Sequence, residues 1–129
     1  MIRYSMPVAI ILTFSISAAF SQPVPDSMAV EWQGKKMCEN LYEDAQIRVL
    51  RCTFPPGSIQ SKHSHPGYFG YVLSGGKFTV EDDKGKREVE QATGQSGASP
   101  PTPGHIITNT GNNMFSVLLV EKKYEPVQH

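Results

Sequence analysis

The chain has 129 residues, with 12 basic and 12 acidic side chains and a formal net charge of zero. This length predicts a single domain. Without a surplus of either charge, the sequence gives no reason to expect nucleic acid or an anionic membrane surface as a partner.

Residues 1–21 are expected to be a signal peptide. A short basic start precedes a mostly apolar run at 6–20, and Ala19-Phe20-Ser21 offers small residues for cleavage before Gln22. The run is short for a membrane span, and an uncleaved N-terminal anchor is the alternative. Cleavage would release residues 22–129 as one exported domain, periplasmic or secreted, with no membrane partner.

The rest of the chain is patterned as short strands separated by turns. After a proline-containing segment at 22–28, expected to be flexible, apolar and charged residues alternate at 47–50, as in a half-buried strand. Residues 92–104 are expected to form an irregular crossing with room for one short strand, and no helical pattern follows the leader. The expected strands are 29–32, 37–41, 47–52, 59–65, 69–73, 78–81, 87–90, 104–110 and 114–121. Many short strands with Gly and Pro turns indicate an all-β sandwich or barrel.

The last expected strand, 114–121, is apolar on both faces. Such a strand suits the middle of a sandwich or the interface of a homodimer. A homodimer is therefore one expected assembly.

Two cysteines, Cys38 and Cys52, lie nearly opposite each other if 37–42 and 47–53 pair as neighbouring strands. In an oxidising compartment such a pair tends to close. The bridge would enclose a loop of about 15 residues and contribute roughly 3 kcal/mol. Two free cysteines on adjacent strands are the alternative.

Three of the four histidines form the most informative pattern of the chain. His63 and His65 are separated by one residue, so on a strand both side chains point to the same face. His105, on another expected strand, could complete a set of three neutral nitrogen ligands for one divalent transition metal such as Fe, Cu, Zn, Ni or Mn. His129, at the C-terminal end, is not expected to be a ligand.

The spacing around these histidines resembles two motifs of the cupin superfamily. In the first, five residues separate Gly57 from His63-Ser64-His65, and Gly75-Gly76 closes the segment. In the second, Pro103, His105 and Asn109 match the core, while the preceding glycine is either Gly94 or Gly97. The resemblance runs from about residue 48 to 121. It implies a double-stranded β-helix, the jelly-roll barrel, whose interior is the ligand cavity into which the histidines point.

The chain departs from the cupin pattern at one position. A glutamate of the first motif usually supplies a fourth ligand, but the candidate positions here are Tyr68, Phe69 and Gly70. The metal would then be held by three histidines alone, as in family members that resemble thiol and diketone dioxygenases. A barrel that binds a ligand without a metal is the alternative.

Other side chains near the motifs are candidates for supporting roles. Tyr68 and Tyr71 follow the histidine pair, and either could face the cavity as a hydrogen-bond donor or acid/base catalyst, or else fill the barrel. Ser61 shares the alternating face of His63 and could contact a histidine. Asn109 resembles a family residue that fixes the end of its strand.

Three functions are compatible with this pattern. The first is a mononuclear-metal oxidoreductase, similar to a dioxygenase, acting on a small organic anion or dicarbonyl. The second is a metal-assisted lyase or isomerase acting on a sugar acid or a similar metabolite. The third is a non-catalytic module that binds a small molecule.

Overall fold

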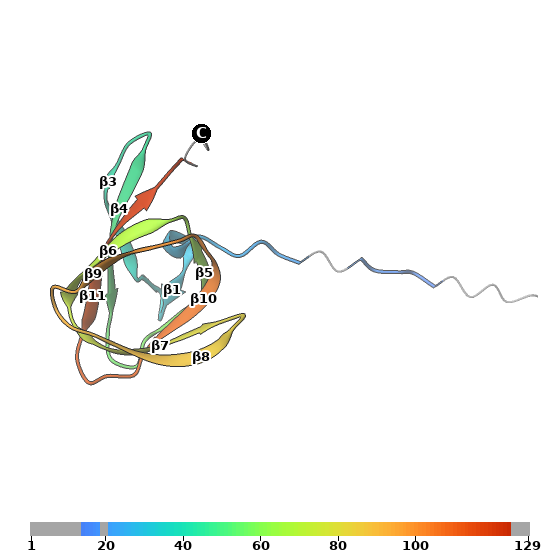
Figure 1. Cartoon of the computed structure of the whole chain (residues 1–129). Coiled ribbons are helices and arrows are strands. Elements are labelled where there is room, and N and C mark those ends of the chain that lie inside the picture. Colours follow the sequence, from blue (N-terminus) through green and yellow to red (C-terminus); the bar gives the residue numbers. More distant parts are fainter. Residues whose placement is uncertain (1–13, 19–20, 125–129) are drawn as a thin grey trace, which may run out of the picture.

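The computed structural model describes residues 14–18 and 21–124 and confirms an all-β jelly roll (Figure 1). The predicted signal peptide falls mostly outside the described residues, and His129 does so entirely. In the described ranges, no helix is long and apolar enough to cross a membrane. The elements are η1 (Ser27–Ala29), β1 (Glu31–Trp32), β2 (Lys35–Lys36), β3 (Cys38–Glu43), β4 (Ile47–Phe54), β5 (Ile59–His65), β6 (Tyr68–Ser74), β7 (Gly76–Asp82), β8 (Gly85–Gln91), β9 (Ser96–Ser99), β10 (Thr102–Asn109) and β11 (Phe115–Lys122).

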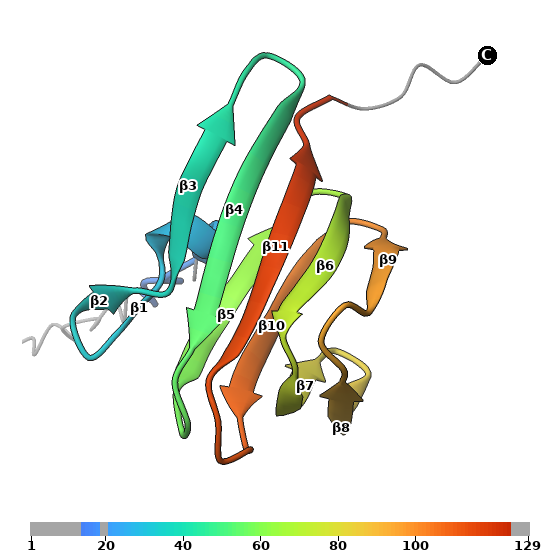
Figure 2. The same cartoon turned by 90° about the vertical axis from the view of Figure 1, so that its left-hand side faces the viewer.

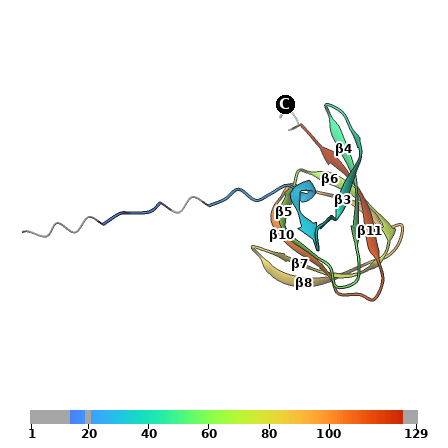
Figure 3. The same ribbon diagram turned by 180° about the vertical axis from the view of Figure 1, so that it is seen from behind.

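Two antiparallel sheets form the walls of the barrel. One has five strands in the order β3-β4-β11-β6-β9, and Figure 2 shows its face with β11 at the centre. The other has four strands in the order β5-β10-β7-β8, which lie across the barrel from the first sheet (Figure 3). Sequence patterning found the principal strands. The expected irregular crossing at 92–104 contains β9 and the start of β10.

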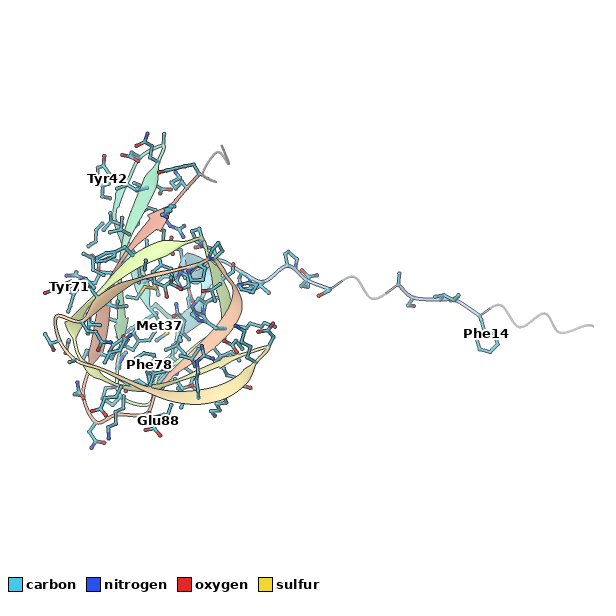
Figure 4. The ribbon with its side chains drawn as sticks, viewed as in Figure 1. Phe14, Met37, Tyr42, Tyr71, Phe78 and Glu88 are labelled. Carbon is cyan, nitrogen blue, oxygen red and sulfur yellow. A yellow bond between two sulfur atoms is a disulfide. The ribbon has the colours of Figure 1, made fainter. Side chains whose placement is uncertain are left out.

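The core lies between the sheets because alternate residues of each strand point inward. On β4, Leu50 is fully buried, whereas the neighbouring Arg51 is exposed. The ring of Phe115 from β11 lies with its centroid 4.6 Å from that of Phe78 on β7 and thereby connects the two sheets. Figure 4 shows Met37 and Phe78 inside the barrel. The apolar side chains fill only part of the interior.

The N-terminal segment packs against the barrel at residues 25–28. Residues 22–28 were expected to be flexible, but the backbone N–H of Ser64 donates to the carbonyl oxygen of Pro25 at 2.8 Å. Asp26 caps η1 by accepting from the N–H of Met28, and Ser27 is fully buried. The expectation was wrong for residues 25–28, because β5 is an edge strand whose backbone groups need a partner.

Cys38 and Cys52 face each other in the β3–β4 register and form a disulfide. Replacing both by alanine is expected to lower the free energy of unfolding by about 3 kcal/mol, because the bridge restricts the unfolded chain. Chemical denaturation would measure this loss. A reducing agent should bring the wild type to the stability of the variant and leave the variant unchanged. Equal stability of the two oxidised proteins would contradict the prediction.

Candidate metal centre

The structure brings His63, His65 and His105 together inside the barrel. β5 and β10 are antiparallel neighbours, and His105 lies opposite His63 in their register. The Nε2 atom of His63 lies 3.1 Å from Nε2 of His65 and 2.9 Å from Nε2 of His105. Among the described residues these three side chains form the one group that could hold a metal ion, and no carboxylate belongs to it.

The β5–β10 pair contains two register shifts, one on each side of His105. Between His63 and Gln60 the strand β5 advances three residues while β10 advances two, from His105 to Ile107. This bulge turns Ser61 away, and its residue is exposed. The expectation that Ser61 shares the face of His63 was therefore wrong for its side chain. Its backbone carbonyl oxygen instead accepts from Nδ1 of His63 at 2.8 Å.

Hydrogen bonds at the outer nitrogens leave the inner nitrogens free to bind. Nδ1 of His63 donates to the Ser61 carbonyl, and Nδ1 of His65 donates to Oε1 of Glu121 at 2.6 Å. Each ring thus carries its proton on Nδ1 and presents a lone pair on Nε2. The Nε2 lone pairs of His63 and His65 face each other at 3.1 Å and repel unless a cation lies between them.

Burial keeps His63 and His105 neutral. Desolvation lowers the pKa of His63 from 6.5 to about 4 and that of His105 from 6.5 to about 3, and neighbouring histidines lower both further. At neutral pH both rings are therefore in the neutral form, with one proton each. Their lone pairs are available without competition from protons.

The spacing of the three nitrogens fits a transition metal. Bonds from a metal to imidazole nitrogen are about 2.0–2.1 Å, which places two nitrogens about 2.9 Å apart at a right angle. The observed separations of 3.1 Å from His63 to His65 and 2.9 Å from His63 to His105 match this value, and all three nitrogens lie within 4.8 Å of one another. The residues therefore fit the metal that the sequence predicted, with its remaining positions open.

Acid should destabilise the metal-free protein through these rings. The folded pKa values of His63 and His105 lie below the unfolded value of 6.5, so the unfolded chain binds more protons between about pH 6.5 and 4. Stability is thus highest above pH 6.5 and falls as the pH is lowered through that window. Unfolding by urea at several pH values would measure the slope, which should be shallower by up to about one proton in His105→Gln. An identical slope in the variant would contradict the assignment.

A cavity of about 600 Å³ opens beside the histidines and provides room for a small molecule. Tyr68 lines it, with its ring centroid 5.4 Å from that of His65. Tyr71 does not line it, because alternation along β6 turns its side chain outward, where it is 43% exposed (Figure 4). The structure thus brings Tyr68, but not Tyr71, to the candidate centre. A catalytic role of either residue stays a prediction.

The family model described as the cupin domain matches residues 50–121, which is more than half of the chain. The chain is a cupin. No curated protein matches it in sequence.

Solved structures similar to this cupin share its fold at low sequence identity. A cupin domain from Bordetella pertussis is 19% identical with a TM-score of 0.64, covering 81% of this chain and 100% of that one. The polyketide cyclase RemF from Streptomyces resistomycificus is 18% identical with a TM-score of 0.55, covering 82% of each chain. KdgF from Halomonas sp. is 19% identical with a TM-score of 0.50, covering 74% of this chain and 88% of that one.

In this cupin no carboxylate takes the place of the usual first-motif glutamate. Phe69 points outward, and the inward position is Gly70. A Cβ atom at Gly70 would lie 3.5 Å from the ring of Tyr68, so this aromatic side chain covers the position. The three histidine nitrogens therefore stand without a carboxylate ligand beside them.

Sequence reasoning missed one residue that contacts the centre. Glu121, at the end of β11, is fully buried and accepts from His65. A signal was present, because alternation from Phe115 through Leu119 places Glu121 on the inner face. The sequence alone did not reveal which group its charge would meet.

Proposed function

We propose that this cupin is a mononuclear-metal oxidoreductase of the dioxygenase type that acts on a small organic anion or dicarbonyl. The observation that carries the proposal is the set of three histidine Nε2 atoms beside a cavity, with that of His63 3.1 Å from His65 and 2.9 Å from His105. A divalent ion bound there would keep its full charge and three open positions. Such a metal supplies Lewis acidity and, if it is Fe or Cu, redox chemistry.

The cavity lining is partly charged and partly apolar. Two acidic and two basic side chains line it, Asp82 and Asp83 with Lys84 and Arg87, and Arg87 pairs with Asp82 at 2.9 Å, while apolar side chains such as Phe54, Phe78 and Val72 line its other parts. An anionic or dicarbonyl head would meet the histidines, and an apolar body would contact the phenylalanines. We therefore expect substrates with two adjacent oxygen donors and a hydrocarbon portion.

Oxygen uptake tests the proposal. Protein reconstituted separately with Fe(II), Cu(II), Mn(II), Ni(II) and Zn(II) would be supplied with β-dicarbonyls and thiols in an oxygen electrode. We expect uptake with Fe or Cu that is lost in His105→Ala. No uptake above the metal-only control with any metal would contradict an oxidoreductase role.

The alternative is a metal-assisted lyase or isomerase without redox change, and the position of Tyr68 favours it. A phenol hydroxyl beside the centre can move a proton, and the fold is shared with the polyketide cyclase RemF. If this alternative holds, Tyr68→Phe should lower turnover about 100-fold while the metal content stays unchanged. Anaerobic turnover by the Zn-loaded protein would measure this. A Tyr68→Phe variant as active as the wild type would exclude proton transfer by this residue.

We also propose that the protein is exported, as the leader predicts. The buried disulfide supports this proposal, because such bridges persist in oxidising compartments. The homodimer stays a prediction. Phe69, Tyr71 and Leu73, all exposed on the outer face of β6, would be available for such a contact.

A further inference from the structure

A chain of charged side chains extends from the candidate metal ligand His65 to the N-terminal segment. Nδ1 of His65 donates to Oε1 of Glu121 at 2.6 Å, and Oε2 of Glu121 accepts from Nε of Arg48 at 2.7 Å. Nη2 of the same guanidinium donates to Oδ2 of Asp26 at 2.8 Å. No sequence motif of the cupin pattern includes these three charged residues.

The burial of Glu121 makes its partners essential. Its side chain is 0% exposed, and an isolated carboxylate there would be strongly unfavourable. Arg48 lies opposite Glu121 in the β4–β11 register and supplies the compensating charge. Both carboxylate oxygens are therefore committed, one to the imidazole and one to the guanidinium.

The N-terminal segment completes the arrangement from outside. The backbone N–H of Met28 donates to Oδ1 of Asp26 at 2.9 Å and fixes this carboxylate. Asp26 also forms a parallel β-bridge with Ser64, the residue between His63 and His65 on β5. Its second carboxylate oxygen holds the exposed side of Arg48. The docked segment thus contacts the backbone of Ser64, next to His65, and reaches the His65 ring through Arg48 and Glu121.

We propose that Glu121 and Arg48 are positioning residues of the metal centre, and that Asp26 couples the centre to the docked N-terminal segment. This inference rests on the metal binding of the proposed function. A carboxylate that accepts from Nδ1 fixes the orientation and tautomer of a ligating imidazole and raises its basicity. Glu121 acts directly on His65, Arg48 holds Glu121, and Asp26 holds Arg48.

Metal affinity tests whether Glu121, which contacts His65 directly, matters more than Asp26, which does not. Zn(II) would be titrated into the full chain in competition with a chromophoric chelator. Glu121→Gln keeps the shape but removes the charge, and we expect an affinity 10–100-fold weaker, the usual effect of losing such a partner. Asp26→Asn should weaken Zn(II) binding about 3-fold, because Asp26 acts on His65 only through Arg48 and Glu121.

Glu39→Gln is the matched control. Glu39 also pairs with an arginine of β4, Arg51, at 3.0 Å, but both are exposed and the cavity does not include them. Its affinity should equal that of the wild type. An equal loss in Glu39→Gln would show that any broken pair on β4 weakens binding and would overturn the specific role of Glu121.

A spectroscopic readout separates positioning from general stability. In ¹⁵N-resolved NMR of the metal-free protein, the Nδ1–H proton of His65 should resonate far downfield and move upfield in Glu121→Gln. Wild-type affinity and an unchanged Nδ1–H signal in that variant would overturn the proposal. If Glu121→Gln failed to fold, Asp26→Asn, which is partly exposed, would decide through the same two measurements. A wild type that binds no Zn(II) would defeat the proposed function, whereas the NMR signal would still report whether Glu121 fixes the ring.

Discussion

Replacing His63 by alanine is expected to weaken divalent metal binding by more than about 100-fold, since losing only an outer partner of a ligand already costs about 10–100-fold. His63 is the central ligand, because its Nε2 atom lies within 3.1 Å of both other Nε2 atoms. Without it, only two imidazoles remain to bind the ion. Competition titration with Zn(II) or Co(II) would measure the change.

His129→Ala is the matched control for this experiment. It removes the fourth histidine, which the sequence predicts to play no part in the site. Its metal affinity should equal that of the wild type. Wild-type affinity in His63→Ala, or a comparable loss in His129→Ala, would contradict the assignment of ligands.

Replacing Asn109 by alanine is expected to destabilise the fold by about 4 kcal/mol without removing a metal ligand. The buried amide donates to the carbonyl oxygens of Phe54 at 2.7 Å and Asn113 at 2.9 Å, and accepts from the N–H of Gly111 at 2.9 Å. Three hydrogen bonds would be lost, and the Phe54 carbonyl would remain buried without this partner. Urea denaturation would measure the loss.

Asn112→Ala provides the comparison for Asn109→Ala, because Asn112 lies in the same turn and is exposed. Its stability should change by less than about 0.5 kcal/mol. Metal affinity of folded Asn109→Ala should stay close to that of the wild type. A stable Asn109→Ala variant with weakened metal binding would mean that the amide serves the site and not the fold.

The histidine cluster could be predicted because it depends on short-range geometry. Two histidines with one residue between them share a strand face whatever the rest of the fold. The match of His105 to the second cupin motif then placed the third ligand on another strand of the same barrel. The register of Cys38 against Cys52 followed from an equally local argument, two strands joined by a short turn.

Other features depended on long-range register and could not be read locally. The bulge at Ser61 inverted the face of one side chain, and alternation alone did not decide between Tyr68 and Tyr71 because the register of β6 was unknown. The partner of Glu121 comes from β5, 56 residues away in the chain. The docking of Pro25 on Ser64 joins a segment without a motif to an edge strand, which only the assembled sheet makes visible.

The most direct test of the metal centre is anomalous X-ray diffraction from crystals grown with one equivalent of Zn(II) or Co(II). We predict one anomalous peak at about 2.0–2.1 Å from the Nε2 atoms of His63, His65 and His105, with none in crystals of His63→Ala. A peak bound to other residues, or the absence of any peak at these three nitrogens at saturating metal, would contradict the account.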